Sequence, residues 1–286
     1  MSGPAVSVVL PTFNRAAMLP HAIASVQSQT WTDWELIVVD DCSTDNTAEI
    51  LRQHSIADPR LRVIRNETNQ KLPRSLNVGF HASEGRFLTW TSDDNIYHPE
   101  ALARLIQALD RNPASGLAYS SMRIIDSEDR FIREFTAKPV DSQPIQPWVG
   151  ACFLYRREVF EAVGDYDPEF FLAEDMDYWM RVRIQFAMVA VPEILYDYRD
   201  HPDSLTANYQ TKIQLAGARV VEKHLDKIDW LTPENRAQTL LGLADAALLR
   251  KDGKAARTWI KLAATSDRGV VMRSFKRQTV RAFLGL

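Results

Sequence analysis

Short runs rich in β-branched and aromatic residues alternate with helical patterns through the first hundred residues. The strand-like runs are residues 6–10, 34–39, 61–64 and 86–90. Apolar side chains recur at helical spacing in the intervening segments, residues 17–28, 48–53 and 72–82. Alternation of this kind is typical of βαβ units. The sequence therefore predicts an α/β fold with a mostly parallel central sheet flanked by helices.

The pattern becomes less regular in the second half of the chain. Further strands are expected at residues 116–120, 131–135 and 149–154, the second of them in an edge hairpin, and residues 173–182 open a helix. We predict a domain boundary near residue 206. Residues 1–205 then form the larger domain and residues 206–286 a C-terminal helical extension, whose helical pair covers residues 236–249 and 254–264. One such pair is too little for a repeat protein.

Polar segments follow three of the predicted strands. They cover residues 11–15, 40–45 and 91–95. Ligands of open α/β sheets bind outside the carboxyl ends of the strands. We therefore expect these three segments to line one crevice.

Composition narrows the classes of protein. The 286 residues carry a net charge of −3 with a pI of about 6.1, whereas a nucleic-acid-binding protein would show a basic face. No run reaches the roughly 18 apolar residues of a membrane span, and the first residues lack the pattern of a secretory signal. Cys42 and Cys152 are far apart, which favours a reducing compartment. We expect a cytoplasmic protein that acts on small polar substrates.

Asp93 and Asp94 directly follow the fourth predicted strand. Mg²⁺ and Mn²⁺ prefer oxygen ligands, and Mg²⁺ is commonly held by one or two carboxylates together with substrate phosphates. The alternative is that one of these residues only caps the helix that begins near Pro99, because Asp is common in such turns. The dipeptide alone leaves both interpretations open.

Four short motifs resemble, in their order, the signatures of the family 2 inverting glycosyltransferases with the GT-A fold. They are LPTFNR at residues 10–15, VVDDCSTDNT at 38–47, TSDD at 91–94 and ED at 174–175. The resemblance covers residues 5–205, and the stretch TSDDNIYHP is most similar to that of the spore-coat polysaccharide glycosyltransferases. It implies a nucleotide-diphosphate sugar as donor, Mn²⁺ or Mg²⁺ as cofactor, and a hydroxyl on a glycan, a lipid-linked molecule or a protein as acceptor.

The resemblance also assigns residues to the donor site. Nucleotide binding falls on residues from several segments, namely Pro11, Thr12, Asn14, Arg15, Asp40, Lys71, Asp93 and Arg199. Asp40 matches the acid that binds the nucleobase. A carboxylate that accepts from an imide N–H favours uracil or thymine, and therefore a UDP- or dTDP-sugar. Lys71 or Arg74 would supply a cation, and Arg199 would pair with a phosphate.

Metal binding and catalysis are assigned in the same way. Asp94 matches the metal ligand, Asp93 matches an acid that contacts ribose or metal, and His201 matches a further metal ligand. Glu174 and Asp175 match the acidic pair that contains the catalytic base, for which we choose Asp175. Inverting transfer needs a base on the face of the sugar opposite the leaving diphosphate. The alternative is a purely structural role, because carboxylates stabilise the first turn of a helix.

Two positions depart from the family pattern. Thr91 stands where the family often has Asp, and Leu76 stands in place of an Arg. These departures keep a non-catalytic nucleotide-sugar-binding relic among the alternatives. A sugar-1-phosphate nucleotidyltransferase would need a glycine-rich loop after the first strand, and residues 11–15 contain no glycine. A nicotinamide dehydrogenase would need G-x-G-x-x-G there.

Residues 272–286 mix basic and large apolar side chains. Such a segment either makes a weak peripheral contact with an anionic membrane or docks as a helix on the body of the protein. The first case would suit a lipid-linked acceptor.

Overall fold

The computed structural model describes residues 3–202 and 204–274. Close contacts divide the chain into two compact units. One unit comprises the chain up to Ala137 and again from Val149 to Asn208, and the other comprises Lys138–Trp148 and the chain from Tyr209 onward. Residues 138–148 thus group with the C-terminal part of the chain, which the sequence pattern did not indicate.

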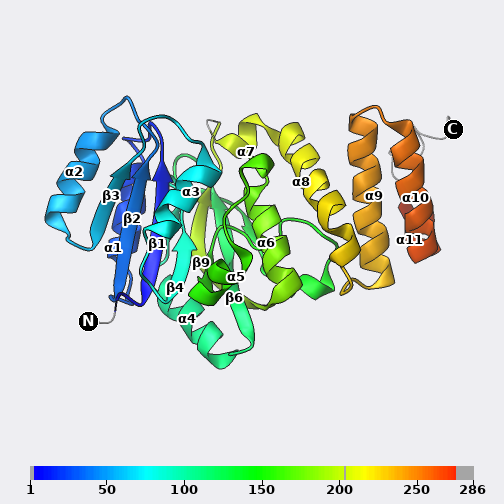
Figure 1. Cartoon of the computed structure of the whole chain (residues 1–286), viewed down its shortest axis with the longest axis horizontal. Coiled ribbons are helices and arrows are strands. Elements are labelled where there is room, and N and C mark those ends of the chain that lie inside the picture. Colours follow the sequence, from blue (N-terminus) through cyan, green and yellow to red (C-terminus); the bar gives the residue numbers. More distant parts are fainter. Residues whose placement is uncertain (1–2, 203, 275–286) are drawn as a thin grey trace. The chain divides into compact units, whose positions relative to one another are not determined.

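A single mixed sheet forms the centre of the first unit (Figure 1). In the described part of the chain its strands are β1 Val6–Thr12, β2 Trp34–Asp40, β3 Leu61–Arg65, β4 Phe87–Trp90, β5 Ile96–Tyr97, β6 Ser115–Ile125, β7 Phe131–Phe135, β8 Phe153–Arg156 and β9 Ala187–Arg199. The strand order is β3-β2-β1-β4-β8-β6-β9-β5, with β7 paired to β6. Strands β3, β2, β1 and β4 are parallel, whereas β8 runs antiparallel to both of its neighbours.

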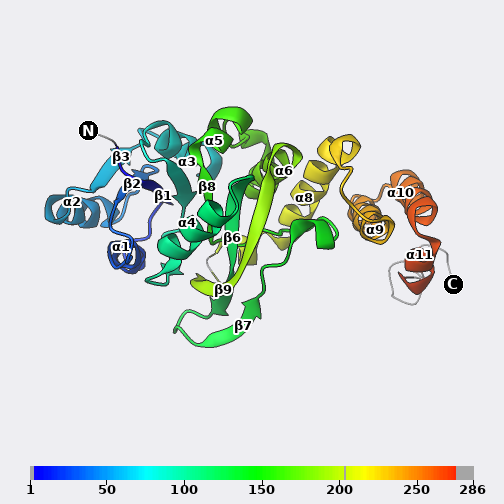
Figure 2. The ribbon, with the colours of Figure 1, turned by 90° about the horizontal axis from the view of Figure 1, so that it is seen from below.

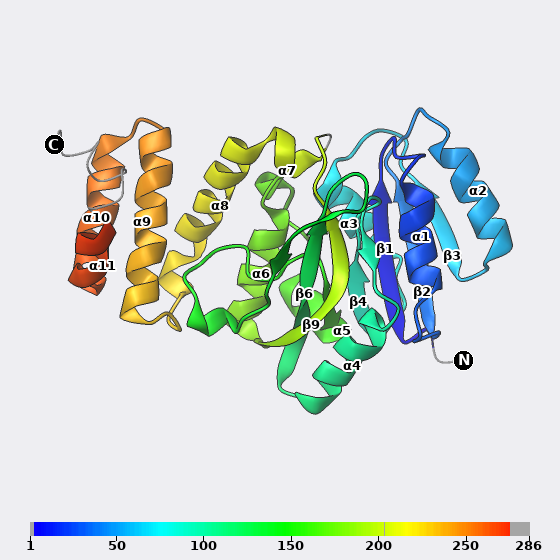
Figure 3. The ribbon, with the colours of Figure 1, turned by 180° about the vertical axis from the view of Figure 1, so that it is seen from behind.

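Helices cover both faces of this sheet. They are α1 Leu19–Gln27, α2 Thr47–Ala57, α3 Leu72–His81, α4 Ala101–Arg111, α5 Arg157–Val163, α6 Glu174–Gln185 and α7 Leu205–Asn208. Figure 2 shows α1 and α4 on one face and α3, α5 and α6 on the other, and Figure 3 shows the face with α1 and α4. The predicted α/β class with helices around a central sheet is confirmed.

Alternation along β1 explains how one strand serves both layers. Val8 and Leu10 belong to the apolar core that α1 and α4 share with the sheet. Val9 points to the opposite layer, where a Cβ atom on Gly79 of α3 would lie 2.4 Å from Val9 Cγ1. Only glycine permits this close approach of α3 to the sheet. Buried parallel strands of this kind are largely apolar on both faces, as the run VSVVL is except at Ser7.

Strand β9 was not predicted, and it is the longest strand of the sheet among the described residues. It contains Pro192, which cannot donate a ladder hydrogen bond and therefore argues against a central strand. The pairing of β9 with β6 shifts at this point, from Ser120↔Val191 to Ser121↔Ile194, so Pro192 lies in a bulge. The predicted strand at residues 149–154 is displaced, because β8 begins only at Phe153.

The second unit consists mainly of helices. They are α8 Gln210–His224, α9 Pro233–Leu249, α10 Gly253–Ser266 and α11 Arg268–Ser274. Thr232 caps α9 and Asp252 caps α10 through side-chain hydrogen bonds to backbone N–H groups, so each helix starts at a residue that favours this position. The predicted helical pair corresponds to α9 and α10. Of the basic segment at 272–286, residues 275–286 lie outside the described residues. Within residues 3–202 and 204–274, no helix combines the length and apolarity of a membrane span.

Candidate active site

The three polar segments predicted to share a crevice do meet at the carboxyl edge of the sheet. Thr12 at the end of β1 is in register with Asp40 at the end of β2, and Val9 of β1 is in register with Trp90 at the end of β4. The loops after β1 and β2 stay adjacent beyond the strands, since the Asp41 N–H donates to the Thr12 carbonyl over 2.9 Å. Parallel strands thus bring loops far apart in sequence to one place.

Asp93 and Asp94 lie in the loop after β4. Asp93 is buried, and Arg15 Nε is 3.9 Å from its carboxylate. Burial and the neighbouring Asp94 carboxylate raise the pKa of Asp93 to about 7, although Arg15 acts in the opposite direction. Asp94 Oδ2 lies 3.0 Å from His201 Nε2, and the His201 side chain is buried. Two elements remote in sequence therefore place a carboxylate and an imidazole side by side.

These two side chains have the chemistry of ligands for a divalent ion. Mg²⁺ ligands lie about 2.0–2.1 Å from the ion in octahedral geometry, so neighbouring donor atoms are about 3 Å apart. The Asp94 and His201 donor atoms meet this spacing at 3.0 Å. No group of three or more His, Cys, Asp or Glu side chains in the described part of the chain is arranged to hold a metal ion. The pair fits an ion whose other ligands come from a substrate or water.

Arg199 does not lie on an open surface. Its guanidinium is almost fully buried and donates to the backbone carbonyls of Asp94 and Asp126, each over 3.0 Å. It also pairs with the Asp129 carboxylate at 2.7 Å. Arg199 is thus held by the protein itself beside the acidic loop.

Asp40 is buried at the end of β2. Its Oδ1 accepts from the Ser43 N–H over 2.9 Å, and its Oδ2 accepts from the Arg65 guanidinium. Arg65 also donates to the Ser43 carbonyl over 2.7 Å, while 46% of its side chain remains exposed. Both oxygens of Asp40 therefore have protein partners, and Arg65 covers the carboxylate.

The other predicted nucleotide-binding residues shape the neighbouring loops. Asn14 adopts the left-handed backbone region with φ of 54°, and its Oδ1 accepts from the Thr44 N–H over 2.7 Å. Pro11 and Thr12 are buried in β1. Asp41 accepts from the Lys71 N–H over 2.9 Å, which fixes Lys71 at a φ of 70° immediately before α3. The Lys71 side chain is exposed.

The acidic pair Glu174 and Asp175 begins α6. Glu174 is buried, and its carboxylate accepts from the Leu172 N–H over 2.7 Å. This contact holds Leu172 in the left-handed region with φ of 78°. Asp175 Oδ1 accepts from the Met176 N–H over 2.7 Å. Burial raises the pKa of both acids, and the Asp175 charge adds to this effect at Glu174.

Tyr198 lies in β9 directly before Arg199, and its hydroxyl is 3.1 Å from the Thr206 hydroxyl. Burial raises the pKa of its hydroxyl, and so do the carboxylates of Asp94, Asp200 and Asp175. Asp94 and Asp175 are therefore both within electrostatic reach of one hydroxyl group.

Both departures from the family pattern have structural roles. The Thr91 hydroxyl lies 2.6 Å from the Tyr196 hydroxyl, and both side chains are buried, so Thr91 connects the end of β4 to β9. Leu76 is fully buried within α3.

Three further residues of the site were not identified from the sequence. Phe13 is 44% exposed and lies between Thr12 and Asn14. Arg65 is the second, through its contact with Asp40. Trp90 is half-buried at the end of β4, and its indole N–H donates to the Tyr166 hydroxyl over 3.1 Å. An exposed aromatic side chain inside a polar motif was the signal available for Phe13, whereas Arg65 ends an ordinary strand pattern.

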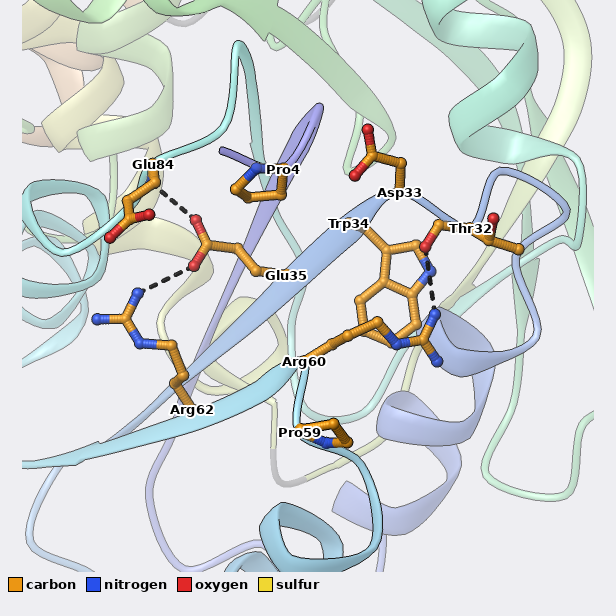
Figure 4. Close-up of a pocket in the computed structure, with 9 residues that line it drawn as sticks. All are labelled: Pro4, Thr32, Asp33, Trp34, Glu35, Pro59, Arg60, Arg62 and Glu84. Atoms are coloured by element: carbon orange, nitrogen blue, oxygen red, sulfur yellow. Dashed lines mark hydrogen bonds and ion pairs between the residues drawn. The ribbon is translucent and has the colours of Figure 1, made fainter. Parts of the chain in front are cut away.

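A pocket of about 470 Å³ lies at the opposite, amino edge of the sheet (Figure 4). Its cations already have partners within the protein. Arg60 stacks over Trp34 at 3.7 Å and donates to the Thr32 carbonyl, and Arg62 pairs with Glu35 at 3.0 Å. These contacts join the start of β2 to β3, so the pocket is separate from the acidic site.

Comparison with known proteins agrees with this fold. A putative glycosyltransferase, EpsE of Bacillus subtilis, is 27% identical over 210 residues, which cover 71% of this chain and 76% of EpsE. A protein of Sinorhizobium fredii, y4gI, is 30% identical over 241 residues, which cover 78% of this chain and 26% of that protein. An uncharacterised glycosyltransferase of Haemophilus influenzae is 28% identical over 185 residues, which cover 62% of this chain and 61% of that protein. The chain thus spans less than two thirds of the length of y4gI and of the Haemophilus influenzae protein.

Solved structures share the fold at low sequence identity. Staphylococcus aureus TarS 1–349 in complex with UDP superposes with a TM-score of 0.62 at 19% identity, over 95% of this chain and 91% of that one. The mannosyltransferase PcManGT from Pyrobaculum calidifontis, in complex with GDP-Man and Mn²⁺, gives a TM-score of 0.65 at 15% identity, over 98% and 83%. The sequence model described as Glycosyl transferase family 2 matches residues 7–164, more than half of the chain. The chain therefore belongs to glycosyl transferase family 2 and has the GT-A fold.

Proposed function

We propose that this glycosyltransferase moves a sugar from a UDP- or dTDP-sugar to an acceptor hydroxyl, with inversion at C1 and with a divalent ion. The observation that carries the proposal is the Asp94–His201 pair at the carboxyl edge of the sheet, where the carboxylates of Asp94 and Asp175 both raise the pKa of the Tyr198 hydroxyl. The side chains of Asp94 and His201 suit an ion beside a diphosphate, and the separate carboxylate of Asp175 suits a general base.

Asp175 is the proposed base. The acceptor oxygen attacks C1 as the bond from C1 to the diphosphate oxygen breaks, and the hydroxyl proton passes to the Asp175 carboxylate. Burial raises the pKa of Asp175, which strengthens it as a base in its ionised form. The Met176 N–H holds the carboxylate in a fixed orientation. Glu174 is less suited, because its carboxylate holds the Leu172 backbone.

Asp94 and His201 would hold the ion, and Asp93 would contact it or the ribose. When bound, Mn²⁺ or Mg²⁺ supplies positive charge to the diphosphate leaving group. The presence of Mn²⁺ with GDP-Man in PcManGT supports the use of a divalent ion. Arg15 near Asp93 and the exposed Lys71 would add positive charge on the protein side.

The nucleoside would lie over the loops after β1 and β2. Pro11, Thr12 and Asn14 form the wall, and the exposed Phe13 ring offers a face to the base. Asp40 would accept from the imide N–H of uracil or thymine through a remaining lone pair, once the half-exposed Arg65 side chain has moved aside. UDP and UDP-GlcNAc in the TarS structures support a uridine nucleotide. The acceptor would be a glycan, a lipid-linked molecule or a protein that the enzyme meets in the cytoplasm.

The experiment is donor turnover with Mn²⁺ or Mg²⁺, followed as release of UDP from a panel of UDP-sugars and of dTDP from a panel of dTDP-sugars. Metal-dependent release of the nucleoside diphosphate is the expected result, and anomeric inversion is read by NMR of the product. Pyrophosphate release from a nucleoside triphosphate and a sugar-1-phosphate would instead favour a nucleotidyltransferase. Donor binding by calorimetry without turnover on any acceptor would favour a relic.

A further inference from the structure

The buried guanidinium of Arg199 joins two segments that are far apart in sequence. Its Nε–H donates to the Asp94 carbonyl in the acidic loop, and Nη1 donates to the Asp126 carbonyl in the turn between β6 and β7. The neighbouring backbone repeats this connection. The Arg199 N–H donates to Asn95 Oδ1 over 2.8 Å, and the Asp200 N–H donates to the Ile125 carbonyl over 2.8 Å. The end of β9 therefore binds both the acidic loop and the turn.

The turn at residues 126–130 has a defined internal structure. Asp126 Oδ1 accepts from the Glu128 and Arg130 N–H groups, and the Arg130 side chain pairs with Asp126 at 2.8 Å. Asp129 adopts the left-handed region with φ of 63°, and its carboxylate reaches Arg199 at 2.7 Å. The turn leads into β7, which Figure 2 shows at the outer edge of the ribbon. The turn thus presents one carboxylate to the buried guanidinium.

The ion pair with Asp129 compensates the buried charge of Arg199. A buried cation is costly unless it is paired and hydrogen-bonded, and Arg199 is 7% exposed. The Asp129 carboxylate supplies its counter-charge from the solvent side, where 68% of that side chain is exposed. The guanidinium in turn donates a hydrogen bond to the Asp94 carbonyl. Loss of the pair would release the backbone of the residue whose side chain faces His201.

We propose that Arg199 and Asp129 are positioning residues, through which the β6–β7 turn sets the geometry of the Asp94–His201 pair. This inference rests on the proposed function, which assigns ion binding to Asp94 and His201. It differs from a direct role of Arg199 on a phosphate, since two backbone carbonyls and one carboxylate of the protein already hold its guanidinium. Removal of a residue that holds a metal ligand in place typically weakens metal affinity about 10–100-fold.

The test is a graded series of variants. Arg199→Met removes all three contacts, whereas Asp129→Asn removes only the charge and keeps a residue that tolerates the left-handed region. Arg130→Gln is the matched control, because Arg130 belongs to the same turn, its side chain is 68% exposed like that of Asp129, and its ion pair does not involve Arg199. Calorimetry measures Mn²⁺ affinity in the presence of UDP, and UDP affinity without metal. Amide hydrogen exchange of residues 92–95 is followed in the metal-free protein.

The expected Mn²⁺ dissociation constant rises about 10–100-fold in Arg199→Met and about two- to fivefold in Asp129→Asn, with no change in Arg130→Gln. Exchange of residues 92–95 accelerates in the same order, and kcat of Asp129→Asn at saturating Mn²⁺ stays within about twofold of the wild type. Unchanged Mn²⁺ affinity in a folded Arg199→Met protein would overturn the inference. So would weaker metal-free UDP binding in that variant, since it would indicate direct phosphate contact.

The experiment distinguishes failure of the proposed ion site from failure of the proposed positioning role. If the wild-type protein itself shows no Mn²⁺-dependent UDP binding, the proposed ion site is wrong and the positioning role is overturned with it. If the wild type binds and the three variants are indistinguishable from it, only the positioning role is overturned.

Discussion

Replacing Asp175 by asparagine removes the proposed proton acceptor while keeping the shape of its side chain. The Asn oxygen can still accept from the Met176 N–H, as Asp175 Oδ1 does over 2.7 Å, so the start of α6 is expected to remain intact. A positioned general base contributes about 10²–10⁴-fold to rate. The substitution should therefore lower kcat by this factor, which corresponds to a barrier higher by about 2.7–5.4 kcal/mol.

The assay is nucleotide release at saturating donor, acceptor and metal, together with UDP affinity by calorimetry. UDP affinity should change by less than about twofold, because Asp175 is assigned to the acceptor side. Glu174→Gln serves as the matched comparison, since a Gln oxygen can still accept from the Leu172 N–H. Its expected loss is below about tenfold, which is less than a general base contributes.

The pH profile adds a second readout. The base must be ionised, and burial raises the pKa of Asp175 above its ordinary 3.8. The value of kcat/KM should fall as the pH drops through this raised pKa, at a higher pH than for an exposed Asp. Asp175→Asn should lose this acid limb. Retention of the wild-type rate and profile by a folded Asp175→Asn protein would refute the assignment of the base.

Three further predictions concern the acidic site and its supports. Asp94→Asn should weaken Mn²⁺ binding in the presence of UDP by at least about tenfold, read by calorimetry, and unchanged binding would contradict its role as ligand. Thr91→Val leaves the buried Tyr196 hydroxyl without this partner and should cost about 1–3 kcal/mol of unfolding free energy in denaturant titrations, whereas an unchanged midpoint would contradict the importance of this contact. Asp197 has a pKa lowered to about 2, against the effect of its burial, by His98 and Arg123, so its contribution to stability is present above its unfolded pKa of about 3.8 and is lost as the pH falls towards 2. Asp197→Asn should flatten the decline of the unfolding free energy between pH 4 and 2, and an equal decline in both proteins would argue against this ion pair.

The elements that could be predicted are those whose pattern depends on local periodicity. The parallel strands β1 to β3 are apolar runs followed by polar loops, and α3 carries one apolar stripe, so their positions follow from the sequence. Strand β9 was missed because Pro192 and Glu193 interrupt its pattern, and only the bulge against β6 makes this tolerable. Local sequence cannot reveal such compensation by a partner strand.

The candidate site likewise combines residues to which sequence motifs point with contacts that only the folded chain reveals. The resemblance of the four motifs, in their order, is what points to Asp93, Asp94 and Asp175, because a carboxylate at a strand end or a helix start alone is equally suited to capping. The sequence could not show that Arg199 is buried and bound to Asp94, Asp126 and Asp129, since this depends on three loops folding together. Arg65 over Asp40 was likewise hidden, because adjacent parallel strands bring the two residues into register.

A crystal structure of the protein with UDP and Mn²⁺ tests the central claim most directly. The account predicts one Mn²⁺ bound by Asp94 and His201 together with the diphosphate, with the Asp175 carboxylate across the sugar site from that ion. An ion bound elsewhere, or an Asp175 carboxylate that lies away from the space in front of the diphosphate, would contradict it.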